Sequence, residues 1–350
     1  MKLTPALIST LFETPMADLT SLDMSNKEVS HIDDISGCIS LRKLNLAKNA
    51  IRSSDALSGL QYLPDLTWLN LSNNSLENFE GLQKLKSLFV LNMSHNELNR
   101  ISIHITSMTE LKALILNHNK IKTIDNLASL TNLNTIVISH NNIQSLPSLP
   151  TLAALTKLSA AHNSIRLVPD LSVNPELKEL RLNDNKILQL PESFRQCSAL
   201  EIVDLGNNIM REWSDIAPLG SLLHLVNLNL KGNPVCEKED YKEKILALIP
   251  SLRVLDGERF DPKFLERRQK QKKHLEFISD LKEKKQRVQE YREKRRQKKD
   301  EKAEAGETDE TKDTDKKSHG KKTTDKTSSF KGKKRGKTSE TPNKRPKVKN

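Results

Sequence analysis

The chain has 350 residues, of which 35% are hydrophobic and 29% charged, and its formal net charge at pH 7 is +12. No apolar stretch reaches the roughly 18 residues that a membrane-spanning helix requires. The three cysteines show no C-x-x-C spacing and form no even-numbered framework. We therefore expect neither a membrane-spanning protein nor a disulfide-stabilised secreted domain, and a reducing compartment is favoured.

The first 18 residues are expected to form a capping helix. Residues 6–12 make a short apolar run that could be mistaken for a signal peptide, but no small-residue cleavage site follows it. Thr4 followed by Pro5 is instead typical of a helix start, with proline at the first helical position. We therefore predict a helix at this end of the fold and no secretion signal.

A repeated pattern, Leu-x-x-Leu-x-Leu-x-x-Asn, runs through the next part of the chain at a spacing of 22 to 27 residues. The leucines direct alternate residues of a short strand into a core. One repeat cannot bury its own apolar side, so stability must come from stacking of neighbours. This leucine-rich-repeat signature predicts an α/β solenoid, a horseshoe with a parallel concave sheet, over residues 19–233. The repeats begin at Leu19, Leu41, Leu66, Leu88, Leu111, Leu133, Leu155, Leu177, Leu200, Leu225 and Leu252.

Residues 234–260 are expected to close the last repeat. A helix around Tyr241 to Leu248, followed by Leu252 and Leu255, would cover the apolar face that the final repeat otherwise exposes. The segment therefore reads as a C-terminal cap.

Charge divides the chain in two. Residues 261–350 carry 32 Lys+Arg and 17 Asp+Glu, which leaves 25 and 28 for the first 260 residues. Residues 263–300 contain neither Gly nor Pro and many strong helix formers, which predicts a charged helix over 261–300. Residues 301–350 have almost no apolar side chains and are predicted to be a disordered basic tail.

The charged helix and the tail carry two further patterns. Heptad-like apolar spacing with a lysine in the seam fits a weak coiled coil, or a single helix with a helical partner, equally well. Its positions are Phe277, Leu281, Lys284, Val288 and Tyr291. Two basic clusters are typical of nuclear import signals or nucleic-acid contacts, a solvated charge run being the alternative. With few aromatic residues nearby, contacts to RNA or DNA would be non-specific and directed to phosphate. The clusters are Lys333, Lys334, Arg335 and Lys344, Arg345, Lys347.

Two features resemble known families. The 22-residue repeats containing Asn-x-Ile-x-x-Ile, such as Asn119 to Ile124, resemble the leucine-rich-repeat regulatory subunit of protein phosphatase 1. Gly232 to Tyr241 together with residues 249–257 resembles the C-terminal cap shared by that subunit, the spliceosomal A-prime protein and the acidic nuclear phosphoproteins. The resemblance covers residues 19–260. It implies the horseshoe fold, with the protein phosphatase 1 catalytic subunit as the first candidate partner.

A partner is expected on the outward positions of the concave strands, which are the second, third, fifth, seventh and eighth of each repeat. Trp68 stands within an apolar run on adjacent strands, which is typical of an interface anchor. Shielding by neighbours or self-association would explain the same run. A mixed-charge zone follows in later repeats. The predicted protein-binding residues are Trp68, Phe89, Val90, Ile115 and Val137 with Glu179, Asp184 and Asp204.

The eighth position holds histidine in four consecutive repeats, at His95, His118, His140 and His162. Strands about 4.8 Å apart would allow these rings to stack. Because no column of cysteines or carboxylates is expected beside them, we favour a polar ladder over a metal site or a pH sensor.

Trp213 falls where another repeat places Ile124 and is predicted to belong to the core.

These features predict a non-enzymatic nuclear or nucleolar scaffold whose concave face binds a protein partner, as a phosphatase regulator. The sequence has no glycine-rich phosphate loop and no nucleophile elbow, so catalysis has no support, and no cofactor or metal is implied. The alternative is an RNA-associated factor in ribosome biogenesis or splicing that acts through the basic tail.

Overall fold

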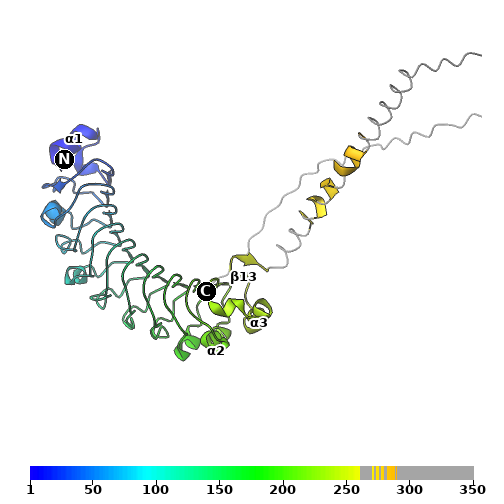
Figure 1. The fold of residues 1–350 in the computed structure, drawn as a ribbon. Coiled ribbons are helices and arrows are strands. Elements are labelled where there is room, and N and C mark those ends of the chain that lie inside the picture. Colours follow the sequence, from blue (N-terminus) through cyan, green and yellow to red (C-terminus); the bar gives the residue numbers. More distant parts are fainter. Residues whose placement is uncertain (261–269, 272, 276, 280–281, 288, 290–350) are drawn as a thin grey trace, which may run out of the picture. The chain divides into compact units, whose positions relative to one another are not determined.

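The computed structural model describes residues 1–260, 270–271, 273–275, 277–279, 282–287 and 289. The chain divides into two units, residues 1–276 and residues 277–350. Within residues 1–260 the repeats stack side by side into an arc (Figure 1). Helix α1 (Pro5–Leu11) lies at its N-terminal end, and α2 (Trp213–Ile216) and α3 (Tyr241–Leu248) lie at the other end.

One twelve-stranded sheet runs through all the repeats, and each strand pairs with the strand of the next repeat. All of these pairings are parallel apart from the last, between β13 and β14. The strands are β2 (Ser21–Asp23), β4 (Lys43–Asn45), β5 (Trp68–Asn70), β6 (Val90–Asn92), β7 (Ala113–Ile115), β8 (Thr135–Val137), β9 (Lys157–Ser159), β10 (Glu179–Arg181), β11 (Ile202–Asp204), β12 (Asn227–Asn229), β13 (Val254–Leu255) and β14 (Glu258–Arg259). The predicted leucine-rich-repeat solenoid is thus confirmed.

Short 3₁₀ helices complete several of the return segments. They are η1 (Met16–Asp18), η2 (Asp55–Tyr62), η3 (Ile103–Ser107), η4 (Glu192–Gln196), η5 (Ala217–Ser221) and η6 (Pro234–Glu237). These helical turns lie along the outer edge of the arc, so the sheet lines its concave edge (Figure 1). The tight i→i+3 turn shortens the return path between strands.

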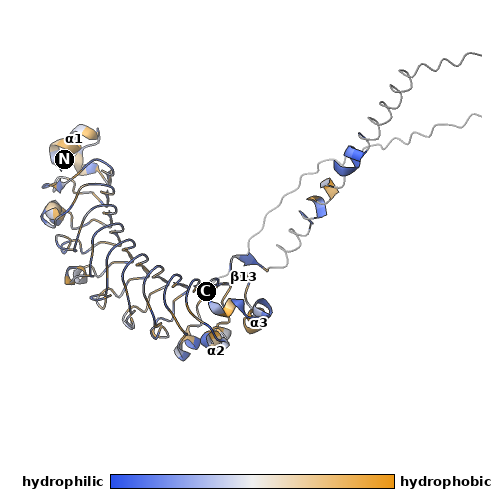
Figure 2. Cartoon of the chain, viewed as in Figure 1, coloured by the Kyte–Doolittle hydropathy of each residue, from blue (hydrophilic) through white to orange (hydrophobic). Residues whose placement is uncertain are grey.

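The core lies between the sheet and the return segments. Leu111, Leu114 and Leu116, which hold the first, fourth and sixth positions of one repeat, are fully buried. The register places Leu114 between Leu91 and Ile136, so equivalent side chains stack from repeat to repeat. Apolar and polar stretches alternate within each repeat (Figure 2). Burial therefore depends on neighbouring repeats, as expected for a solenoid.

A ladder of asparagines joins consecutive repeats. The Asn119 side chain accepts a hydrogen bond from the Leu98 N–H at 3.1 Å and donates to the carbonyls of Met93 and Leu116, each at 3.0 Å. Asn96 and Asn141 make equivalent bonds in the repeats on either side. The side chain thereby satisfies buried backbone groups that no strand partner reaches.

The position before each ladder asparagine has a left-handed backbone conformation. Lys48, Asn73, His95, His118, His140, His162, Asp184 and Asn207 have φ between 52° and 57°, and Gly232 has φ 82°. Asn, Asp, His and Gly tolerate this region best. The predominance of these residue types at the eighth position therefore has a backbone cause.

The N-terminal end of the solenoid carries a helix and a small second sheet. The Thr4 hydroxyl caps α1 by accepting the Leu7 N–H at 3.2 Å, and Ile8 is buried. A two-residue strand, β1 (Lys2–Leu3), also pairs in parallel with β3 (His31–Ile32). This second small sheet was not predicted, because its two strands are short and distant in sequence.

The C-terminal cap forms around α3 at the predicted residues. Tyr241 and Ile245 are buried, and Leu252 and Leu255 close the same face. The Tyr241 hydroxyl donates to an Asp256 carboxylate oxygen at 3.0 Å. Trp213 was predicted to be core but is only partly buried: its ring lies 6.4 Å from the Tyr241 ring, between centroids. The Lys244 ammonium of α3 lies over the same indole ring, 5.3 Å from its centroid.

Beyond the solenoid, the described residues 270–271, 273–275, 277–279, 282–287 and 289 are helical. Phe277 and Lys284 of the suggested heptad pattern are among them, whereas Leu281, Val288 and Tyr291 lie outside the described residues. So do most of the charged helix and the whole basic tail, which stay predictions. In the described part of the chain, no helix is both long and apolar enough to cross a bilayer.

Candidate functional site

The concave sheet presents the predicted apolar residues in two pairs. The register sets Trp68 beside Val90 at the third position, and Ile115 beside Val137 at the fifth. All four side chains are half-buried. Val90 faces Ala113, two residues before Ile115 on the same strand, so the pairs are displaced diagonally from one another. The apolar run is therefore a diagonal band rather than a single row.

Phe89 lies at the edge of this band. It occupies the second position of its repeat and is 38% exposed. The Lys112 ammonium lies over its ring, 4.6 Å from the centroid. A cation–π contact of this kind keeps the ring in place while leaving it accessible to a partner.

The predicted mixed-charge zone is held together by internal bonds. The Glu179 carboxylate contacts the Lys157 ammonium at 3.0 Å and the Arg181 guanidinium at 2.6 Å. Burial raises the pKa of Glu179, but the hydrogen bonds from these two cations outweigh it, so the pKa lies below its ordinary value. Asp204 accepts a hydrogen bond from the Asn229 amide at 2.8 Å. Glu179 is therefore compensated by cations, whereas Asp204 is hydrogen-bonded to a neutral amide.

The four histidines form a stacked column, as the sequence suggested. Successive ring centroids from His95 to His162 are 4.1, 4.0 and 4.0 Å apart, with interplanar angles of 10 to 14°. Burial and the neighbouring imidazoles lower the pKa of His118 and His140. Because the ring nitrogens of parallel stacked imidazoles do not converge on one point, the column does not form a metal site. Among the described residues no cluster of His, Cys, Asp or Glu could hold a metal ion.

The sequence analysis expected no column of carboxylates beside the histidines, but it did not identify the single carboxylate at the end of the column. A carboxylate oxygen of Asp184 lies 3.3 Å from His162 Nε2 and ends the column. The other Asp184 oxygen accepts a hydrogen bond from the Asn207 amide at 2.8 Å. Asp184 holds the eighth position of the repeat after His162. A comparison of the eighth position across one more repeat would therefore have identified this carboxylate from the sequence.

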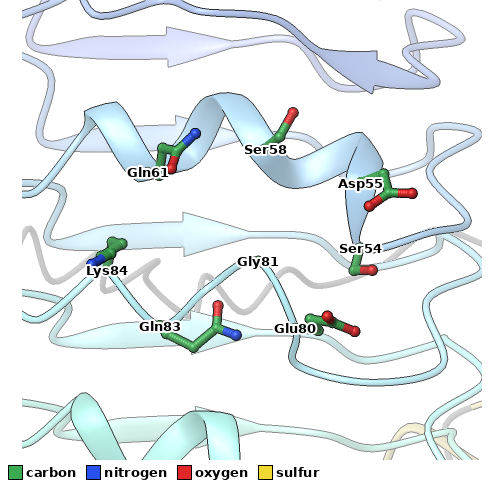
Figure 3. A pocket seen from close by; sticks show the side chains of 8 residues that line it. All are labelled: Ser54, Asp55, Ser58, Gln61, Glu80, Gly81, Gln83 and Lys84. Atoms are coloured by element: carbon green, nitrogen blue, oxygen red, sulfur yellow. The ribbon is translucent and has the colours of Figure 1, made fainter.

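The outer side of the arc carries a polar hollow of about 460 Å³ between η2 and the next return segment. Figure 3 shows its lining side chains, which come from residues 54–61 and 80–84. Gly81 has φ 89°, and a Cβ there would lie 3.0 Å from the Ser54 carbonyl oxygen, so the segments pack closely.

The three thiols have no disulfide partner. Burial raises the pKa of Cys197 to about 11 and that of Cys38 above its ordinary value. The Cys236 thiol donates to the Leu230 carbonyl at 3.0 Å, and its pKa is also raised, mainly by burial. All three are thus protonated at neutral pH and are poor nucleophiles.

Comparison with known proteins agrees with the fold. Three family models match the chain: "Leucine-rich repeat" over residues 159–290, "Leucine rich repeat" over 39–98, and "Leucine Rich repeats (2 copies)" over 109–151. An internalin C2 structure from Listeria monocytogenes superposes with a TM-score of 0.51 at 31% identity, covering 55% of this chain and 82% of that one. The APL1 leucine-rich repeat domain superposes with a TM-score of 0.58 at 26% identity, covering 73% and 64%.

Similar sequences among characterised proteins are confined to short stretches. U2 small nuclear ribonucleoprotein A′ of Eremothecium gossypii is 63% identical over 35 residues, 10% of this chain and 15% of that protein. Its Schizosaccharomyces pombe counterpart is 40% identical over 60 residues, 17% and 25%. Acidic leucine-rich nuclear phosphoprotein 32-related protein 2 of Oryza sativa is 44% identical over 63 residues, 17% and 22%. The chain thus spans a quarter or less of these relatives.

Fold and family matches together define the class: the chain is a leucine-rich-repeat protein. Within that class it is similar, over part of its length, to U2 small nuclear ribonucleoprotein A′ and to the acidic leucine-rich nuclear phosphoproteins.

Proposed function

We propose that this chain is a non-catalytic nuclear scaffold that binds a protein partner on its concave sheet. The observation that carries the proposal is the half-buried Trp68, beside Val90 on a continuous sheet whose backbone is pinned by the asparagine ladder. An aromatic side chain on a rigid surface loses little freedom when a partner covers it. Such residues dominate the binding energy of many interfaces.

Two roles are compatible with this scaffold. The one we place first is an RNA-associated role. The relatives described above are named as components of a small nuclear ribonucleoprotein and as nuclear phosphoproteins. Their names support a nuclear, splicing-related assembly with the basic tail adding non-specific affinity for RNA. Regulation of protein phosphatase 1, implied by the repeat resemblance, is the second candidate. Nucleolar residence belongs to the same proposal and is favoured by the lysine-rich tail.

The test uses the full chain as bait in nuclear extract, with and without ribonuclease. Enrichment of ribonucleoprotein components supports the first role, and enrichment of the phosphatase catalytic subunit with or without ribonuclease supports the second. For the purified partner, calorimetry should show that Trp68→Ala weakens binding by about 2 kcal/mol, roughly thirtyfold, because a central aromatic anchor is lost.

The matched control is Lys122→Ala, an exposed change on a return segment that should leave affinity unaltered. Both variants should unfold at the wild-type temperature. Equal affinities for Trp68→Ala and wild type would move the partner site to the mixed-charge zone around Asp184 and Asp204, or off the solenoid altogether.

A further inference from the structure

The middle of the concave face lacks negative charge. In the six repeats that begin at Leu41, Leu66, Leu88, Leu111, Leu133 and Leu155, no outward position holds Asp or Glu. The same positions hold five Lys or Arg and four His. We call these positions the acid-free face. Asp23 before it and Glu179 after it mark its limits. The asymmetry is local, because residues 1–260 as a whole contain 28 Asp+Glu and only 25 Lys+Arg.

Some cations of the acid-free face are paired with a carboxylate and others are not. Arg42 pairs with Asp65 at 3.1 Å, and Lys157 pairs with Glu179 at 3.0 Å. Within the described residues Lys43, Lys48 and Lys112 form no ion pair with a carboxylate. A partner's carboxylate could therefore approach them without displacing an existing one.

The fifth position adds two free hydrogen-bond donors. The Asn70 side-chain oxygen accepts the Ser72 N–H, and the Asn92 oxygen accepts the Ser94 N–H, each at 3.0 Å. These bonds hold the side-chain oxygens of both residues. In the part of the chain that the structure describes, neither NH₂ group has an acceptor. Each therefore offers donors and no acceptor to a partner.

The apolar band crosses this same donor-rich surface. Lys43 lies opposite Trp68 across one pair of strands, and Asn70 lies opposite Asn92 across the next. The aliphatic side chains of Val90, Ile115 and Val137 continue the band. Proteins that bind single-stranded nucleic acid stack successive bases on aromatic side chains. Beyond Trp68 and Phe89 this band is aliphatic, which suits the apolar side chains of a peptide.

We propose that the acid-free face binds an acidic amphipathic protein segment, whose apolar side chains cover the Trp68 band and whose carboxylates meet Lys43, Lys112 and the Asn70 and Asn92 amides. The inference rests on the proposed scaffold function and specifies the chemistry of its partner. Charge complementarity of this kind selects among partners that share an apolar anchor.

The test introduces one negative charge without altering shape. Asn92→Asp keeps the oxygen that accepts the Ser94 N–H, just as Asp204 accepts the Gly206 N–H two residues on in a later repeat. Asn99→Asp makes the same change at an exposed position on a return segment and serves as the matched control. Both are made in the full chain, together with Trp68→Ala.

The probes are three labelled molecules measured by fluorescence anisotropy: an amphipathic peptide of Glu, Leu and Phe, a polyglutamate peptide of equal charge, and oligouridine. Polyglutamate reports attraction between charges without contacts to the apolar band. We expect Asn92→Asp to weaken binding of the amphipathic peptide by about tenfold, since it places like charges together. Asn99→Asp should change the affinity for this peptide by less than about twofold, because exposed charges usually have small effects. Trp68→Ala should also weaken this peptide and leave polyglutamate unchanged.

The outcomes separate the two proposals. If Trp68→Ala weakens binding of the amphipathic peptide but Asn92→Asp does not, the acidic partner is refuted and the proposed site on the concave face is retained. No loss with either variant would overturn both. Oligouridine binding that depends on Trp68 would overturn the inference in favour of a nucleic acid.

Discussion

The asparagine ladder makes a quantitative prediction about stability. Replacing Asn119 by Ala removes one acceptor and two donors from a side chain that is 9% exposed. The three backbone groups that lose a hydrogen bond differ in whether they keep another one. The Met93 carbonyl keeps its bond from Asn96, and the Leu116 carbonyl keeps its bond from Asn141, at 3.1 and 3.0 Å. The Leu98 N–H loses its acceptor.

The magnitude follows from this inventory. A buried donor left without a partner destabilises by about 1 to 3 kcal/mol, and each weakened carbonyl adds roughly half of an ordinary bond of about 1 kcal/mol. Asn119→Ala should therefore lower the free energy of unfolding by about 2 to 4 kcal/mol. Because neighbouring repeats stabilise one another, the loss should appear in the main unfolding transition.

The assay is urea unfolding of the full chain, followed by circular dichroism. Asn142→Ala is the control, because its exposed side chain makes no hydrogen bond in the described structure and should change stability by less than about 0.5 kcal/mol. If Asn119→Ala were no more destabilising than Asn142→Ala, the ladder would not be what joins the repeats.

Two further outcomes are expected. The pKa of His118 and His140 lies below the ordinary 6.5, so the unfolded chain takes up protons first as pH falls through that value, and stability should drop there. His118→Asn with His140→Asn should flatten this dependence in urea midpoints measured across pH, since asparagine already occupies the same backbone conformation at Asn73; an unchanged slope would contradict the assignment. Alanine at the six tail residues should move a fluorescent fusion to the cytoplasm without changing thermal unfolding, because the core is built from residues 3–255, and a fusion that stays nuclear would refute the targeting hypothesis. Those residues are Lys333, Lys334, Arg335, Lys344, Arg345 and Lys347.

The repeat register could be predicted from the sequence because it depends on local periodicity. Leucines at alternating positions define which side of each strand is buried, and one repeat predicts the next. Leu114 faces the core, α3 begins at Tyr241 and Thr4 caps α1, all as the residue types indicated. The outward direction of Trp68 followed from the same alternation.

Contacts between residues distant in sequence were decided only by the tertiary structure. The pairing of Lys2–Leu3 with His31–Ile32 has no local signal, because two residues carry no periodicity. The partial exposure of Trp213 depends on how α3 packs beside it. The bond between His162 and Asp184, and the separation of compensated from uncompensated cations on the acid-free face, depend on the spacing of strands and on side-chain directions. A repeating sequence determines its own stacking, whereas the chemistry of the surface arises only where the stacked strands bring particular side chains together.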